Sequence, residues 1–306
     1  MALTLSVDKV DENGRELLTY GTTEFPIAFF DDDLTKVAVP PHWHDEFELV
    51  VITEGKVRAR IAGREFILSA GEGYFANNGI LHTEALESKT GHQHAMVFSP
   101  HMISCEPDLV WKSCVSPVLN NPRLPFIRLT AAVPWQKDIL AMAESAWQYG
   151  AYEKKDYPIH VRYLLSQAFA LIVSHAETIE SESAYTDKYQ RDELRVKKTL
   201  LFIEKNYEAA ITLDEIAGSA SISVSTCLRL FNTVLGTTPI HYLMEYRLQR
   251  ALEELSHPGN RSIAEIAHSC GFTDASYFNR CFLRAYGVTP SKRMLNPGEE
   301  EKPYFR

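Results

Sequence analysis

The chain has 306 residues, of which 45% are apolar, with five cysteines and a formal net charge of −9. This size fits about two globular domains and excludes a disordered chain. The longest apolar runs fall short of the roughly 18 residues of a membrane span. The first 20 residues are acidic and have no basic start, so we expect no signal peptide. The cysteines form no CxxC pair, so we expect a cytoplasmic protein without disulfides, without a thiolate zinc site and without a membrane partner.

Charge is unevenly distributed along the chain. Residues 1–190 contain 16 basic and 26 acidic side chains, whereas residues 191–306 contain 15 and 14. DNA affinity depends largely on basic side chains that contact phosphates. The net negative charge of the whole chain comes from the first part, so it argues against a nucleic-acid partner only there. We therefore expect the two parts to have different functions.

The first part changes its pattern along the chain. From about residue 17 to 100, short alternating runs such as 47–53 and 57–61 are separated by glycine-containing turns, which predicts an antiparallel β-barrel or sandwich. From about 135 to 178 the apolar residues recur at helical spacing and predict two amphipathic helices.

A polar segment without apolar periodicity follows and predicts a linker over about 181–192. The predicted fold class is therefore α+β with two domains. The first covers residues 1–180, and the second, all-α, covers residues 193–298.

The second part contains an internal repeat. Leu213-x-x-Ile216-Ala217 recurs as Ile263-x-x-Ile266-Ala267, and Arg229-x-Phe231-x4-Gly236-x2-Pro239 recurs as Arg280-x-Phe282-x4-Gly287-x2-Pro290. Packed helices alone would explain apolar spacing, but they would not explain two copies with matched turns and matched endings.

Each copy predicts a short helix, a tight turn and a longer helix. The longer helix begins at a capping residue, Ser223 in the first copy and Thr273 or Asp274 in the second. This is helix-turn-helix geometry, so we expect two such units, at about 212–235 and 262–286. The segment 239–256 starts with proline and predicts one connecting helix.

In a helix-turn-helix unit the outward side chains of the second helix reach base edges in the major groove. In the second copy we expect Phe272, Phe278, Cys281 and Phe282 to point inward. The predicted DNA-contacting residues are Ala275, Ser276, Asn279 and Arg280 in the second copy and Ser225, Leu228, Arg229 and Asn232 in the first. Arginine suits guanine and asparagine suits adenine. The face of the first copy is less polar, so we expect it to read fewer bases.

Residues 195–295 resemble the DNA-binding domain of the AraC/XylS transcriptional regulators. The resemblance is closest in Ser262-Ile263-Ala264-Glu265-Ile266-Ala267, Gly271-Phe272-Thr273-Asp274 and Gly287-x-Thr289-Pro290. It implies that the outward positions face double-stranded promoter DNA, and that an activator would also contact RNA polymerase. It further implies that the helices at 135–178 form the contact of a homodimer or the seam between domains; packing within their own domain is the alternative.

The first part also carries a histidine motif. His42, His44 and Glu48 are separated by even numbers of residues, so on a strand they share one face, and His82 can join them from a neighbouring strand. Imidazoles with one carboxylate suit divalent Zn, Fe, Ni, Cu or Mn.

Together these four residues resemble the cupin family, a small β-barrel whose two motifs contribute three histidines and one glutamate to a metal. Asn77 stands where the second motif has proline. Two interpretations stay open: the four residues bind a metal, or they are the polar lining of a pocket for a small-molecule effector, without metal. Trp43 and Phe47 suit an aromatic or sugar effector and equally suit the barrel core.

These observations predict a transcriptional regulator that responds to a small molecule bound in the N-terminal barrel. The alternative is a metal-dependent cupin enzyme fused to a DNA-binding module. No second group of catalytic acids or bases stands beside the predicted ligands, so we expect no enzymatic activity.

Overall fold

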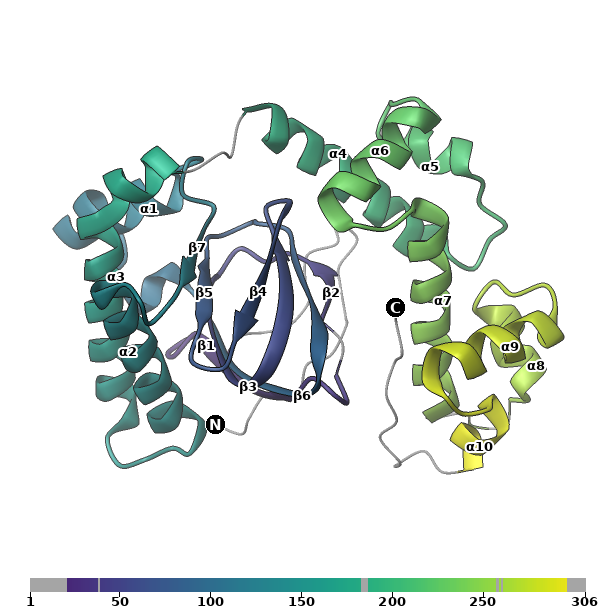
Figure 1. Ribbon diagram of the computed structural model, residues 1–306, viewed down its shortest axis with the longest axis horizontal. Coiled ribbons are helices and arrows are strands. Elements are labelled where there is room, and N and C mark those ends of the chain that lie inside the picture. Colours follow the sequence, from purple (N-terminus) through teal and green to yellow (C-terminus); the bar gives the residue numbers. More distant parts are fainter. Residues whose placement is uncertain (1–20, 38, 183–186, 257–258, 260, 296–306) are drawn as a thin grey trace. The chain divides into compact units, whose positions relative to one another are not determined.

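The structure is a computed structural model that describes residues 21–37, 39–182, 187–256, 259 and 261–295 (Figure 1). These residues fall into two compact units, one up to Gln190 and one from Arg191 onward. Within the described ranges, no helix has an apolar stretch long enough to cross a membrane.

The first unit is built on an antiparallel sheet of seven strands. The strands are β1 (Ile27–Asp33), β2 (Val39–His42), β3 (Phe47–Ile61), β4 (Arg64–Ser69), β5 (Gly73–Ala76), β6 (His82–Phe98) and β7 (Phe126–Leu129). Their order is β1-β6-β3-β5-β7, with β2 paired to β6 and β4 paired to β3. The predicted antiparallel sheet is therefore confirmed, and its closure into a barrel stays a prediction. Residues 17–20, where the predicted barrel begins, lie outside the described residues.

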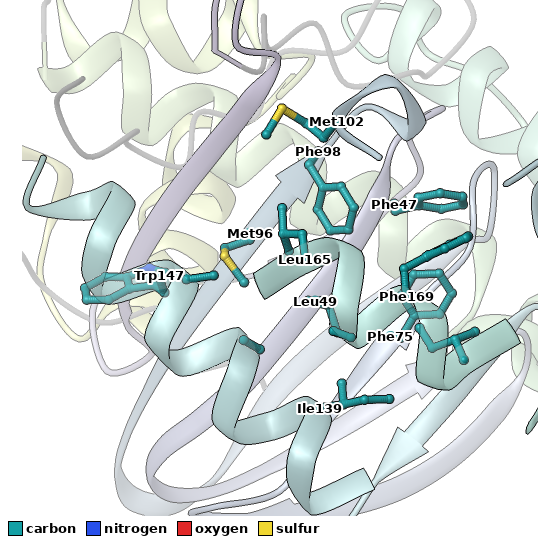
Figure 2. Packing of buried hydrophobic residues seen from close by; sticks show 14 of the residues in the cluster. Phe47, Leu49, Phe75, Met96, Phe98, Met102, Ile139, Trp147, Leu165 and Phe169 are labelled. Carbon is teal, nitrogen blue, oxygen red and sulfur yellow. The ribbon is translucent and has the colours of Figure 1, made fainter. Parts of the chain in front are cut away.

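The sheet is buried on both faces, as β3 illustrates. Consecutive strand residues point to opposite faces, so Phe47 and Leu49 lie on one face and Val50 and Ile52 on the other, and all four are buried. Two helices, α2 (Pro134–Ala151) and α3 (Tyr157–Glu182), cover the first of these faces, where the sequence predicts a pair of helices. Figure 2 shows this packing, in which side chains of both helices join those of the sheet: Phe47, Leu49, Phe75, Met96, Phe98, Met102, Ile139, Trp147, Leu165 and Phe169. We call this the helix-covered face.

We call the opposite side of the sheet the inner face. Its apolar members form a separate core cluster that contains Ala28, Val50, Ile52, Tyr74, Ala95 and Val97. The chain between β6 and β7 forms three short helical segments, η1 (Pro100–Met102), η2 (Trp111–Val115) and α1 (Ser116–Leu119). Asn77 is buried beside this connection and donates its amide to the carbonyls of Val118 and Leu124, at 2.8 and 3.0 Å.

The long ladder between β3 and β6 is interrupted near its middle. Gly55 pairs with Gly91, but Val57 pairs with Leu86, so residues 87–90 bulge out of β6. Gly55 has a φ of +77°, and a Cβ there would lie 2.0 Å from the carbonyl oxygen of Thr90, so only glycine fits. Bulges bend strands, and both strands curve visibly in Figure 1. The bend lets residues from distant parts of β6 meet on the inner face.

The second unit is entirely helical in its described part. Its helices are α4 (Asp187–Asn206), α5 (Leu213–Ser219), α6 (Val224–Leu235), α7 (Pro239–Ser256), α8 (Ile263–Ser269), α9 (Ala275–Tyr286) and α10 (Pro290–Leu295). The pairs α5–α6 and α8–α9 lie where the two helix-turn-helix units are expected, and α7 connects them. The sequence predicts the second domain over residues 193–298. The structure describes this domain up to Leu295, so residues 296–298 lie outside the described residues.

The caps of these helices show that the two copies are built alike. Thr212 with Glu215, and Ser262 with Glu265, form reciprocal capping boxes at the starts of α5 and α8. Asp274 caps α9, which decides between the two predicted capping residues, and Ser223 caps α6. Both longer helices end at a left-handed glycine, Gly236 and Gly287.

The cores of the two copies also correspond. Ile216 and Phe231 are buried in the first copy, and Ile266 and Phe282 in the second. Phe272 and Phe278 point inward as predicted. Cys281, expected to be inward as well, is only half-buried because it lies at the margin of the α9 stripe.

The segment predicted as a linker is partly helical. Residues 187–192 form the start of α4, α3 continues to Glu182, and residues 183–186 lie outside the described residues. Lys188, Gln190 and Arg191 are good helix formers, and the first turns of α4 bury the polar Asp192 and Glu193, so this part of the helix has no apolar stripe. A linker between the two units stays a prediction.

A close contact between α2 and β1 gives a test of the packing. A Cβ on Gly150 would lie 2.0 Å from the ring of Phe29, which is itself 2% exposed and unable to move aside. Gly150→Ala should therefore lower the free energy of unfolding of the first unit by about 1–3 kcal/mol, as overpacking usually does. Urea unfolding of purified protein measures this loss.

Gly218, in α5, is the matched control because a Cβ there meets nothing within 4 Å. Gly218→Ala should leave stability unchanged or raise it by about 0.5–1 kcal/mol. Equal effects of the two substitutions would contradict this account of the α2–β1 contact.

Candidate metal centre and nucleic-acid interface

Three of the predicted ligands meet on the inner face of the sheet. His42 ends β2, His82 begins β6, and these two residues are register partners, while His44 lies two residues after the end of β2. One ring nitrogen from each histidine lies within 4.8 Å of the others. His44 and His82 are both 1% exposed, and His42 is half-buried. This buried triad can hold a metal ion.

The orientation of each ring is fixed from behind by the backbone. Nδ1 of His42 lies 2.8 Å from the carbonyl of Pro40, Nδ1 of His44 lies 3.2 Å from that of Glu46, and Nδ1 of His82 lies 2.8 Å from that of Ile80. A carbonyl only accepts, so Nδ1 is the donor in all three rings. In the neutral ring Nε2 then keeps its lone pair, which is the tautomer that metal-binding histidines adopt when a carbonyl holds the other nitrogen.

Glu48 completes the set that the sequence predicts. Its Oε2 lies 2.9 Å from Nε2 of His82 and 3.7 Å from Nε2 of His44, and the Tyr74 hydroxyl donates to the same oxygen at 3.4 Å. Burial by itself raises the pKa of the Glu48 carboxyl, but the nearby His82 and His44 hold it well below its usual range. The site therefore contains an ionised carboxylate beside three imidazoles, a donor set that suits a divalent transition metal.

The inner face holds further buried polar side chains that sequence reasoning missed. They are Asp32 on β1, Tyr74 on β5, and Glu84 and Gln93 on β6. Burial raises the pKa of Glu84 to about 8, and the charges of Glu48 and Asp32 raise it as well. We call Asp32, Glu48, Tyr74, Glu84 and Gln93 the inner polar cluster. A signal for Glu84 was present, because it follows His82 by two residues and so shares its face of the strand.

Three other aromatic or histidine side chains near the motif or on the same strands have no place in the site. Phe47 packs against Phe169 of α3 and is core, whereas Trp43 is buried outside both described clusters. His94 stacks on Trp147 with 3.4 Å between ring centroids, and its Nδ1 lies 2.8 Å from a carboxylate oxygen of Glu144. His94 therefore joins β6 to α2 and has a structural role.

In the second unit all eight predicted DNA-contacting residues are exposed. On α9 they are Ala275, Ser276, Asn279 and Arg280, and on or at the start of α6 they are Ser225, Leu228, Arg229 and Asn232. Arg280 forms no ion pair with any described residue, whereas a guanidinium nitrogen of Arg229 lies 4.0 Å from a carboxylate oxygen of Asp192. Of these two arginines, Arg280 in the second copy is therefore the one that has no ion pair with a described residue.

Each of the two units contains a segment that matches a known protein family. Residues 24–148 match an AraC-like ligand binding domain, and residues 216–294 match a helix-turn-helix domain. The uncharacterised HTH-type transcriptional regulator YdeC of Bacillus subtilis is 30% identical over 287 residues, which are 92% of this chain and 96% of YdeC. The chain belongs to the AraC family of transcriptional regulators.

Other AraC-family proteins are similar over different lengths. The transcriptional activator RhaS of Citrobacter koseri is 23% identical over 87% of this chain and 90% of its own. The crystal structure of an AraC-type regulator from Chromobacterium violaceum has 28% identity over 35% of this chain and 95% of its own, with a TM-score of 0.34.

Membership of the AraC family decides between the two expected functions. The family consists of DNA-binding transcriptional regulators and not of enzymes, so the alternative of a metal-dependent cupin enzyme is set aside. The first unit of this AraC-family protein is a ligand-binding domain, and the second binds DNA through its helix-turn-helix units.

A buried carboxyl in the DNA-binding unit predicts a pH dependence. Tyr242 of α7 donates to Oε1 of Glu204 of α4 at 2.8 Å, while Oε2 is buried without a hydrogen-bond partner among the described residues. Burial raises the pKa of Glu204 from its ordinary 4.5 to about 7. Folding therefore favours the protonated form, and its contribution to stability is full below pH 4.5 and is lost as the pH rises through about 7.

Glu204→Gln should remove this loss, because the amide keeps an acceptor for Tyr242 and carries no charge. At pH 8 the variant should be more stable than the wild type by up to about 3 kcal/mol, and at pH 4.5 the two should differ little. Urea unfolding at both pH values measures the difference. A stability difference that is the same at pH 4.5 and pH 8 would show that Glu204 does not titrate in this range.

Proposed function

We propose that this AraC-family protein changes its binding to promoter DNA when a small-molecule effector occupies the inner face of its first unit. The buried histidine triad, with its backbone-held Nδ1 atoms, is the observation that carries the effector site. An effector can shift the DNA-bound state only by its different affinity for two arrangements of the protein. We further propose that the protein is a homodimer in the cytoplasm and that it contacts RNA polymerase if it is an activator.

The DNA-contacting set that we propose is Ser225, Leu228, Arg229, Asn232, Ala275, Ser276, Asn279 and Arg280. Exposure of all eight supports it. Arg280 suits a bidentate bond to guanine and Asn279 suits adenine. Leu228 is apolar and Arg229 is ion-paired, which supports the proposal that the first copy contacts fewer bases than the second.

Arg280→Ala should weaken binding to the cognate operator by about 5- to 150-fold, equivalent to the 1–3 kcal/mol of one good base contact. Binding to unrelated DNA should fall less, because that affinity rests on phosphates. Fluorescence anisotropy with labelled operator and with scrambled duplex, at one salt concentration, measures both.

The control is Arg123→Ala, which removes the same charge from an exposed position of the first unit. It should leave both affinities close to wild type. Equal operator affinities of the Arg280→Ala variant and the wild type would remove Arg280 from the proposed interface.

For the first unit we propose that His42, His44, His82 and Glu48 hold a divalent transition metal of the Zn, Fe, Ni, Cu or Mn type. The residues fit such an ion because three imidazole nitrogens and one carboxylate converge on one place. A bound ion would supply positive charge beside Glu48 and a coordination position for an effector. The competing proposal is that the same side chains contact an organic effector without metal.

His44→Ala and Glu48→Ala separate these two proposals. If the site binds metal, elemental analysis of wild-type protein reconstituted with each metal should give near-stoichiometric content for at least one, and both variants should lose it. His101→Ala removes an exposed histidine and should retain the metal. Circular dichroism confirms that each variant is folded. Wild-type protein that retains none of the five metals would leave the organic-effector proposal standing alone.

A further inference from the structure

The longer helices of the two helix-turn-helix units present side chains at equivalent positions. Helices α6 and α9 are each 12 residues long and begin at Val224 and at Ala275. The second, fifth, sixth and ninth residues of each helix share one face, because the last three of these are three, four and seven residues from the first. Recognition helices of homeodomains contact bases from positions with the same spacing. In this protein all eight residues at these positions are exposed: Ser225, Leu228, Arg229 and Asn232 in α6, and Ser276, Asn279, Arg280 and Leu283 in α9.

Two of the four positions are identical in the two helices, and two are exchanged. The second residue is serine in both helices, and the sixth is arginine in both. The fifth residue is Leu228 in α6 and Asn279 in α9. The ninth residue is Asn232 in α6 and Leu283 in α9. Each helix therefore presents one leucine and one asparagine beside its arginine, but in opposite order.

The exposed leucines match a particular feature of DNA. Leu228 is 38% exposed and Leu283 is 45% exposed, so both keep apolar surface in water that a partner can cover. In the major groove the thymine methyl group is the apolar feature of the base edges, and apolar side chains contact it. Asparagine instead forms two hydrogen bonds with adenine. A leucine at one of these positions therefore favours thymine, and an asparagine favours adenine.

The spacing of the exchanged positions suits neighbouring base pairs. The fifth and ninth residues are four positions apart, which is about 6 Å along the helix axis at about 1.5 Å per residue. Successive base pairs of DNA are about 3.4 Å apart. A helix that follows the groove therefore brings these two side chains to bases about two steps apart, with the arginine between them.

We propose that Leu283 is a further base-contacting residue, and that the two copies bind operator segments in which an adenine and a thymine exchange places. In the segment bound by α9, Asn279 selects the adenine and Leu283 the thymine. In the segment bound by α6, Leu228 selects the thymine and Asn232 the adenine. This inference rests on the proposed DNA-contacting set, and it adds one specificity-determining residue and the relation between the two segments.

Replacement of single methyl groups in DNA tests the contact of Leu283. Full-length wild-type protein first selects its preferred sequence from a pool of random duplexes. Each thymine of that sequence is then replaced in turn by deoxyuridine, which pairs like thymine and lacks only the methyl group. Fluorescence anisotropy at one salt concentration measures the affinity for each duplex. We expect one replacement in the segment bound by α9 to weaken binding about fourfold, as the loss of one buried methyl group does.

Leu283→Ala shows whether this methyl group contacts Leu283. The variant should bind the unmodified duplex about three- to tenfold more weakly than the wild type, and the same replacement should then have no further effect, because the two changes remove one interaction. Leu295→Ala is the control, because it removes an exposed leucine of the same unit outside both recognition helices, and it should respond to deoxyuridine as the wild type does. Circular dichroism confirms that both variants are folded. A Leu283→Ala variant that responds to every replacement as the wild type does would overturn the inference.

A double variant, Asn279→Leu with Leu283→Asn, tests the exchange. It gives α9 the order of side chains found in α6. Selection from a pool randomised in the segment bound by α9 should then recover thymine where the wild type recovers adenine, and adenine where the wild type recovers thymine. Unchanged base preferences at both positions would overturn the inference.

The selection and the Arg280→Ala variant separate this inference from the proposed function. A pool in which no sequence is enriched would contradict sequence-specific binding, and the inference would fail with it. If a sequence is enriched and Arg280→Ala weakens binding to it, but no thymine depends on Leu283, the proposed function stands and only the inference on Leu283 is overturned.

Discussion

The two-residue repeat of the β3–β6 ladder is the constraint on which the first unit depends. Because neighbouring residues point to opposite faces, this one ladder separates a mostly apolar helix-covered face from an inner face that carries polar groups. Phe47 and Glu48 are adjacent in the chain, yet one packs against α3 and the other lies among imidazoles. A slip of one residue in the register would exchange them and abolish both the core and the site.

The inner face is organised before any ligand arrives. Backbone carbonyls two residues away orient His42, His44 and His82, so no further side chain is needed to hold the rings. Positions set in this way lose little conformational freedom on binding, which is the general benefit of preorganisation.

The sequence predicts what is local and repeated. The two helix-turn-helix units follow from capping residues, glycine endings and the spacing of Phe231 and Phe282, all of which act within one or two turns of helix. The histidine motif follows from even spacing on a strand. The closeness of Glu84 and Gln93 could not be predicted, because it depends on a bulge and on strand pairing across the sheet. The start of α4 was missed because its first turns bury the polar Asp192 and Glu193 in place of apolar side chains. The strand β7 was missed because four residues give little pattern.

The stack of His94 on Trp147 lies beside the inner polar cluster in the sequence, although it is on the other side of the sheet. Gln93 and His94 share a peptide bond and face opposite sides of β6, one toward the inner polar cluster and the other toward α2. His94 also lies 2.8 Å from a carboxylate oxygen of Glu144 on α2. Two adjacent residues of one strand therefore contribute both to the polar inner face and to the attachment of α2 to the sheet.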